Sequence, residues 1–181
     1  VATLSQAEIC GVATAPFVLD LEQLSQRVKE RSSIDTPALY ERIFRGGMPA
    51  LISGQYSDYR AVYSSYISTY IDRDVKEISG AILENFAVSE IAKSYQNCGQ
   101  EAFIYYYRDK DTKEIDILLE DSGKLYPMEI KKTATPQSQL TRVFGVIDKA
   151  ALERGTGAVL CTTDRLSAFD SRNLIVPIWG I

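Results

Sequence analysis

The sequence contains no histidine at any of its 181 positions. Without an imidazole, the chain has no Ser-His-Asp or Cys-His triad, no histidine-ligated zinc site and no histidine proton shuttle. Cysteine is scarce as well: Cys10, Cys98 and Cys161 are far apart and form no CxxC pair, which argues against a disulfide framework and a zinc knuckle. We therefore expect buried free thiols in a reducing, cytoplasmic environment.

Signals for membrane insertion and nucleotide binding are also missing. No uncharged apolar run approaches the roughly 20 residues of a membrane helix, so we expect no membrane partner. The chain has no Gly-x4-Gly-Lys-Ser/Thr loop, since Gly123-Lys124 is followed by leucine, and it therefore lacks an ATP phosphate cradle. A start at Val1 without methionine or a basic leader is expected inside a longer protein, and the apolar ending 175–181 is typical of a natural terminus.

The composition favours a folded domain without a basic surface overall. Hydrophobic residues make up 45% and charged residues 24%, and 24 acidic against 20 basic side chains give a net charge of −4. A bulk electrostatic footprint for nucleic acid is therefore absent. The stretch 122–155 is locally basic, and we interpret it as a solvated strand end followed by a mixed-charge helix. Its charged residues are Lys124, Lys131, Lys132, Arg142, Lys149 and Arg154 against Glu129, Asp148 and Glu153.

Residues 1–79 have the pattern of a helical segment. Three short helices are predicted from capping signals. Their starts are Ser5 with Glu8, Asp20 with Gln23, and Thr36-Pro37, and their glycine ends are Gly11 and Gly46-Gly47. The second helix is expected to bury one stripe, made of Leu21, Leu24 and Val28. From Ser57 to Ile78, tyrosine and aliphatic residues recur at helical spacing, which predicts a long helix with a tyrosine-rich core face.

Residues 80–181 have an α/β pattern and are predicted to form a second unit. A helix over 81–97 is followed by strands over 102–108, 113–119 and 124–131, by a helix opened at Thr135-Pro136 and closed at Gly155, and by strands near 157–162 and 173–178. We therefore predict an α/β fold with two parts, a helical segment (1–79) and an α-β-β-β-α-β core (80–181).

Candidate chemistry is concentrated in the runs 113–119 (KEIDILL) and 128–131 (MEIK). A two-residue turn at Ser122-Gly123 would place Asp116 opposite Glu129, and strand alternation places Glu129 and Lys131 on one face, about 7 Å apart. Opposed like charges destabilise a sheet, so the two carboxylates persist most easily if a divalent cation or a lysine neutralises them, and carboxylate oxygens suit Mg²⁺ or Mn²⁺. The pattern indicates either a metal-assisted hydrolase or a non-catalytic interaction domain with a structural charge cluster.

Glu84, on the preceding helix, is a further candidate. It shares a helical stripe with Val88 and Ile91, an apolar face expected to pack on the sheet. Because Ile82 and Phe86 are apolar on the opposite side, either face could point inward. Glu84 is therefore either a site carboxylate or an ordinary first-turn acid favoured by the helix dipole.

The order of elements and the acidic pattern together resemble the PD-(D/E)xK nuclease superfamily, whose core runs helix, three-strand meander, helix, strand. The residues that carry the resemblance are Asp116, Glu129 with Lys131, and the helical Glu84, with Ile115 in place of the usual proline. It implies a restriction-endonuclease-like core in which Asp116, Glu129 and the Ile130 carbonyl hold Mg²⁺ or Mn²⁺. Lys131 would then orient the water that attacks a nucleic-acid backbone.

A closer resemblance covers most of the chain. The runs 40–49 (YERIFRGGMP), 63–75 (YSSYISTYIDRDV), 105–116 (YYYRDKDTKEID) and 125–134 (LYPMEIKKTA) resemble a bacterial and archaeal family in which an AAA-type ATP-binding domain precedes a domain of unknown function with a nuclease-like end. It implies an upstream ATPase domain as partner, with ATP bound only outside this chain, and makes residues 1–79 a lid of that ATPase or a linker. The chain departs from the family between Val75 and Ala81, where members carry a winged-helix-like segment that lends a DNA-docking role.

Overall fold

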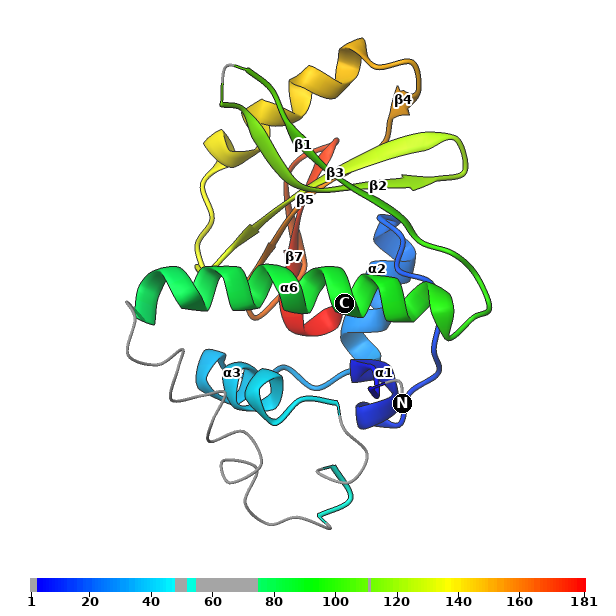
Figure 1. The fold of residues 1–181 in the computed structure, drawn as a ribbon, viewed down its shortest axis with the longest axis vertical. Helices are drawn as coiled ribbons and strands as arrows, with labels where there is room; N and C mark the ends of the chain where they lie inside the picture. The colour runs from blue at the N-terminus through cyan, green and yellow to red at the C-terminus, as the bar shows by residue number, and fades with distance from the viewer. Residues whose placement is uncertain (1–2, 48–51, 55–74, 111) are drawn as a thin grey trace.

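The computed structural model describes residues 3–47, 52–54, 75–110 and 112–181 (Figure 1). A mixed β-sheet forms its centre, with the long helix α6 (Val75–Gln96) packed on one face and the 3-10 helix η1 (Ser138–Lys149) on the other. The N-terminal helices α1 (Gln6–Cys10), α2 (Leu21–Glu30) and α3 (Thr36–Arg45) gather on the α6 side. The fold is therefore α/β with a helical N-terminal part. Positions 57–74 of the expected tyrosine-rich helix lie outside the described residues.

Seven described strands make up the sheet. They are β1 (Phe103–Arg108), β2 (Glu114–Asp121), β3 (Lys124–Lys131), β4 (Glu153–Arg154), β5 (Gly157–Cys161), β6 (Ser167–Asp170) and β7 (Asn173–Pro177), and the 3-10 turn η2 (Ile178–Gly180) follows them. The order is β1-β2-β3-β5-β7-β6, with β4 beside β3. β1, β2 and β3 form the expected antiparallel meander, whereas β3, β5 and β7 run parallel. The all-buried GAVLC run of β5 fits a central parallel strand that is covered on both faces.

Four elements differ from the sequence prediction. The segment after Thr135-Pro136 is a 3-10 helix that begins at Ser138 and ends at Lys149, not an α-helix closed at Gly155. β4 and β6 were not predicted, since strands of two and four residues are too short to show an alternating pattern. Helix α6 starts at Val75 and continues through Gly80, because packing along its length outweighs the cost of about 1 kcal/mol for an interior glycine.

Two hydrophobic cores lie on opposite faces of the sheet. On the α6 face, Leu83, Ala87 and Ile91 pack against strand residues that include Ile117 and Met128. The second core lies beneath η1 and is smaller. Its buried members are Ile115, Leu118, Leu125, Phe144 and Ile147. Neighbouring residues of β2 and β3 enter different cores, so the side chains on both faces of these strands contribute to a hydrophobic core.

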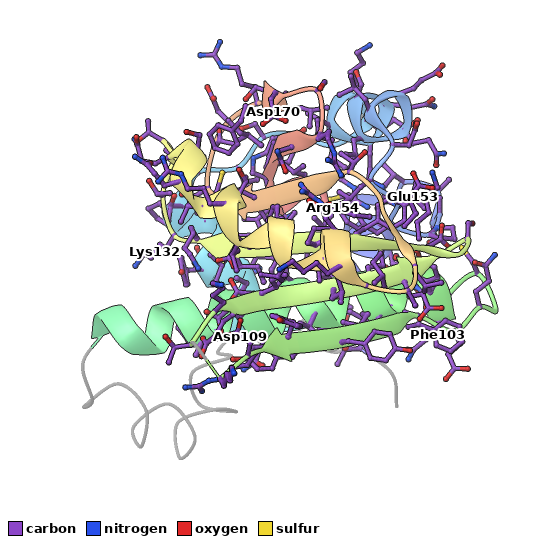
Figure 2. The ribbon with its side chains drawn as sticks, turned by 90° about the horizontal axis from the view of Figure 1, so that it is seen from above. Phe103, Asp109, Lys132, Glu153, Arg154 and Asp170 are labelled. Atoms are coloured by element: carbon purple, nitrogen blue, oxygen red, sulfur yellow. The ribbon has the colours of Figure 1, made fainter. Side chains whose placement is uncertain are left out.

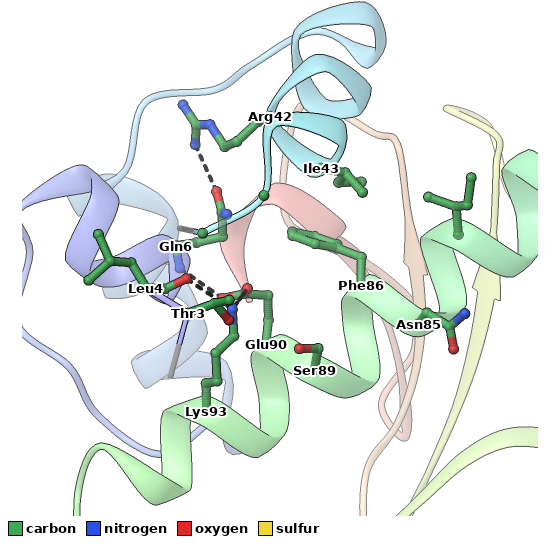
Figure 3. Close-up of a pocket in the computed structure, with 13 residues that line it drawn as sticks. Thr3, Leu4, Gln6, Arg42, Ile43, Asn85, Phe86, Ser89, Glu90 and Lys93 are labelled. Carbon is green, nitrogen blue, oxygen red and sulfur yellow. Dashed lines mark hydrogen bonds and ion pairs between the residues drawn. The ribbon is translucent and has the colours of Figure 1, made fainter. Parts of the chain in front are cut away.

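The N-terminal segment is attached to α6 through a buried carboxylate. Glu90, 5% exposed, accepts a hydrogen bond from the Gln6 backbone nitrogen at 2.8 Å and forms an ion pair with Lys93. Lys93 in turn donates to the Leu4 carbonyl at 3.0 Å, and these groups line a cavity of about 300 Å³ between the N-terminal helices and α6 (Figure 3). The predicted capping box of Ser5 and Glu8 is present at the start of α1.

Some predictions of burial are wrong. On α2, Leu24 is buried as expected, but Leu21 is 57% exposed because the inward stripe is narrower than the pattern suggested. Of the three thiols, only Cys161 is buried, while Cys98 is intermediate and Cys10 is exposed. Among the described residues, no helix is both long enough and apolar enough to cross a membrane.

Candidate active site

The β2–β3 hairpin has the predicted register. Asp121 pairs with Lys124 across the turn, and the ladder continues to the pair Ile117 and Met128. Ser122 and Gly123 both have positive φ, at 50° and 74°, as a two-residue hairpin turn requires. One step past the last pair, the Asp116 carboxylate accepts a hydrogen bond from the Ile130 backbone nitrogen at 2.8 Å. This bond fixes Asp116 against the end of β3.

A β-bulge lies beside this aspartate. Tyr105 pairs with Leu118 and Tyr107 with Ile115, so two steps along β1 correspond to three steps along β2. The extra residue falls within the stretch that contains Asp116, and as a result Ile115 and Leu118 enter the same core beneath η1. The bulge interrupts only the pairing of β2 with β1, so it leaves the alignment of β2 with β3 intact.

Two carboxylates and one ammonium group converge where β3 ends. The Lys131 Nζ atom lies 3.2 Å from Asp116 Oδ2 and 2.8 Å from Glu129 Oε2. The side chain of Glu129 is 8% exposed and that of Asp116 is 17% exposed, whereas Lys131 is 37% exposed. The three predicted groups therefore meet at one place, and solvent reaches it along Lys131.

The cluster lies on the face of the sheet that η1 covers. Met128 and Ile130 pack in the core on the α6 side, whereas Leu125 packs beneath η1. Alternation along β3 therefore places Glu129 and Lys131 on the same face as Leu125.

Burial dominates the electrostatics of this cluster. Desolvation raises the pKa of Glu129 to about 7; the charge of Asp116 adds to this rise, and the hydrogen bond with Lys131 opposes it. Burial also acts to lower the pKa of Lys131, but the hydrogen bond to Glu129 and the charge of Asp116 outweigh it, so the pKa of Lys131 is raised. The lysine is thus held as a cation beside a carboxyl group that gains a proton easily.

Glu84 lies near the cluster without joining it. Partial burial raises the pKa of Glu84, and the charge of Asp116 raises it further while Lys131 opposes the change. No hydrogen bond or ion pair links Glu84 to another described residue. Its stripe faces the sheet only in part: Val88 is 36% exposed, whereas Ile91 is fully buried beside Leu83 and Ala87 on the inward face of α6.

The donor set fits a small divalent cation. Asp116 and Glu129 supply converging carboxylate oxygens, and Mg²⁺ is commonly held by one or two carboxylates with water in the remaining positions. Burial keeps the pKa of Glu129 raised even though Lys131 is paired with this carboxylate. Among the residues the structure describes, however, no three acidic or cysteine side chains lie together as a ready metal cage. Such an ion would therefore depend on two carboxylates, with backbone oxygen and water completing its ligands.

Sequence reasoning missed a contact between the N-terminal helices and this site. The ammonium group of Lys132, next to Lys131, lies 5.0 Å from the centre of the Tyr40 ring on α3. This distance is within the range of a cation–π interaction. The two residues are 92 positions apart, with α6 and strands β1–β3 between them, so no local pattern links them.

The pH dependence of stability tests the environment of Glu129. Because its folded-state pKa of about 7 lies above the ordinary 4.5, the folded protein holds a proton between these pH values that the unfolded chain has released. The free energy of unfolding therefore falls as the pH rises through this window. Relative to wild type, Glu129→Gln should become more stable on going from about pH 5 to about pH 8, by on the order of 1–3 kcal/mol. Urea unfolding in EDTA measures the difference; an equal difference at both pH values would contradict the burial effect.

This geometry defines a mixed α/β module with a carboxylate–carboxylate–lysine cluster at the end of its central hairpin. Residues 79–181, which contain all but the first turn of α6, the seven described strands and the cluster, match the family model described as a domain of unknown function (DUF4143). The chain belongs to this family. No curated protein matches the chain. No solved structure matches it either.

Proposed function

We propose that this chain carries a metal-dependent, nuclease-like module that hydrolyses phosphodiester bonds in nucleic acid. The observation that supports it best is the meeting of Asp116, Glu129 and Lys131 at the solvent-accessible end of β3. The proposal includes the interpretation of the core as PD-(D/E)xK-like, with a restriction-endonuclease-like fold for residues 80–181.

Each residue has a distinct task in this proposal. Asp116 and Glu129, with the Ile130 carbonyl, would hold Mg²⁺ or Mn²⁺, which polarises the phosphoryl oxygen and activates water. Asp116 is oriented for this by the Ile130 backbone nitrogen. Lys131, kept protonated by its two acidic neighbours, binds the phosphate charge and orients the attacking water. Glu84 is close enough to add negative charge on the α6 side.

The resemblance to the ATPase family supports the second half of the proposal. In this view the chain is the C-terminal part of an AAA-type ATP-binding protein, and ATP is bound by an upstream domain. The helical segment 1–79 then serves as a lid of that ATPase or as a linker. The contact of Tyr40 with Lys132 attaches this segment to the residue that follows Lys131.

A second candidate function is an inactive, nuclease-fold interaction domain that recruits a partner or substrate for the ATPase. It is favoured by the ion pairs that Lys131 already makes with both carboxylates, which neutralise much of the cluster without a metal. The net charge of −4 favours it as well.

Metal-dependent stability and cleavage separate the two functions. For the nuclease, Mg²⁺ or Mn²⁺ should raise the melting temperature, corresponding to about 2.7 kcal/mol at a hundredfold excess over the Kd, and Asp116→Asn should abolish the rise. Asp121→Asn, at the other end of β2, is the matched control and should retain it. Oligonucleotide cleavage should require the metal and disappear in Lys131→Met but not in Lys124→Met, on the same strand. If the metal has no effect on wild type and Asp116→Asn is neutral or stabilising, the interaction domain is correct.

A further inference from the structure

A groove runs between η1 and the β1–β2 edge of the sheet. Its volume is about 980 Å³, at the upper end of the range for small-ligand pockets. Its floor is apolar, and its rims carry three basic side chains. The floor consists of Leu118, Leu125, Val143, Val146 and Ile147; the basic residues are Lys113, Arg142 and Lys149; and Tyr107 stands at one wall.

The 3-10 geometry of η1 explains how these side chains come to line one groove. In a 3-10 helix, residues three apart are stacked in line along the axis. Gln139, Arg142 and Gly145 form one such row, and Val143, Val146 and Lys149 form a second, and both rows face the groove. The third row faces the core: Phe144 is fully buried there, and Ile147 lies between the core and the floor of the groove. Arg142 and Lys149 therefore stand in neighbouring rows, about 120° apart around the helix axis.

The charge of the groove is not neutralised within the described residues. Lys113, Arg142 and Lys149 form no ion pair with a described carboxylate. Asp109 is the one acidic residue of the lining, and its carboxylate accepts a hydrogen bond from the Lys113 backbone nitrogen at 2.9 Å. In a chain with net charge −4, a groove with three unpaired cations and one acid is complementary to a polyanion.

The groove leads toward the candidate active site. Its apolar floor and the Asp116–Glu129–Lys131 cluster lie on the same face of the sheet. Lys113 precedes Asp116 by three residues, about 10 Å along an extended strand. In Figure 2, Asp109 of the groove lining and Lys132, which follows Lys131 of the cluster, both lie toward one end of the sheet, whereas Phe103 and Glu153 lie toward the other.

We propose that this groove binds a single strand of nucleic acid and directs it to the cluster. An apolar floor with an aromatic wall suits unpaired bases, and the cations on the rims suit the phosphates, which is the usual combination in single-strand binding sites. A duplex keeps its bases stacked inside and would leave the apolar floor uncovered. The choice of nucleic acid over other polyanions rests on the proposed function, whereas the location and the single-strand preference rest on the groove.

Binding without cleavage tests the groove directly. A fluorescein-labelled oligothymidylate or oligouridylate of about a dozen nucleotides is titrated with the full 181-residue chain in EDTA, and fluorescence anisotropy is recorded across a salt series. Three phosphate contacts predict a slope of log K against log salt of about −2, which Arg142→Ala should reduce to about −1.4. Charge reversal in Arg142→Glu or Lys149→Glu should weaken binding at low salt by more than about tenfold.

The matched control is Lys29→Glu on α2, an exposed lysine beside Asp20 and Glu22 on a different surface. It should leave the affinity unchanged, and melting temperatures verify that all variants are folded.

The inference is overturned if the groove variants bind normally, if Lys29→Glu weakens binding equally, or if a duplex or polyglutamate competes as well as the single strand. Strand binding that depends on Arg142 supports the groove even if no metal-dependent cleavage occurs, in which case only the hydrolytic function fails. Cleavage that is unaffected by Arg142→Glu refutes the groove and leaves the nuclease standing.

Discussion

Replacing Lys131 by methionine is expected to lower the free energy of unfolding by about 3 kcal/mol at about pH 8 in metal-free buffer. Methionine retains much of the apolar stem but removes the ammonium group that lies 3.2 Å from Asp116 and 2.8 Å from Glu129. The two carboxylates are then left largely buried without their cation. The estimate is at the lower end of the range for a broken buried pair, because Asp116 retains 17% exposure and its bond to the Ile130 nitrogen.

The effect of Lys131→Met should depend on Glu129. At about pH 5 the loss should shrink, since Glu129 is then protonated and no longer repels Asp116. In a Glu129→Gln background, Lys131→Met should cost less than about 1 kcal/mol, so the double-mutant cycle should show strong coupling. Urea unfolding of the four proteins measures it. Additive effects would mean that the three groups act independently despite their distances.

The effect of Mg²⁺ on the stability of Lys131→Met distinguishes a metal-binding cluster from a structural charge cluster. If the cluster holds a divalent cation, the ion should stabilise Lys131→Met more than wild type, because it replaces the missing positive charge between the carboxylates. If Mg²⁺ leaves both proteins unchanged, the lysine is a structural counter-ion and the interaction-domain function is favoured. The same protein preparation thus reports on stability and on metal binding separately.

The candidate site could be predicted because its geometry depends on local rules. The Ser122-Gly123 turn sets the hairpin register, both residues have the required positive φ, and strand alternation then places Glu129 beside Lys131. Asp116 meets them because register propagates along the ladder from the turn. None of these steps needs information about distant parts of the chain.

The parts that sequence reasoning missed depend on contacts across the fold. The bulge in β2 arises from its pairing with β1, and no residue near Asp116 marks it. The 3-10 form of η1 escaped prediction because Leu140, Val143 and Phe144 have the i, i+3, i+4 spacing that is typical of an α-helix. Arg142 and Lys149 had been interpreted as charges of an ordinary solvated helix, because the groove that η1 forms with the sheet depends on residues far away in the sequence.

Replacing Phe144 by alanine is expected to lower the free energy of unfolding by about 4 kcal/mol. Phe144 is completely buried and holds η1 on the sheet, with its ring 5.6 Å from the guanidinium group of Arg154. Val146→Ala is the comparison within η1: Val146 is only partly buried, at the edge of the same core, and its truncation should cost about 1 kcal/mol. Chemical denaturation measures both.

Replacing Gly157 by alanine tests whether the Phe144 ring determines how closely η1 approaches the sheet. A Cβ atom at Gly157 would lie 2.6 Å from Phe144 Cδ2 and 2.9 Å from Asn173 Oδ1, so Gly157→Ala should cost about 2 kcal/mol by overpacking. In the Phe144→Ala background the ring no longer obstructs the methyl group, and the cost should fall below about 1 kcal/mol; the remainder reflects Asn173, which Arg154 holds at 2.7 Å. Gly145→Ala, whose nearest neighbour is 3.9 Å away, controls for the change in backbone freedom and should be neutral or slightly stabilising. An equal cost of Gly157→Ala in both backgrounds would mean that something other than the ring sets the spacing of η1, and with it the width of the groove.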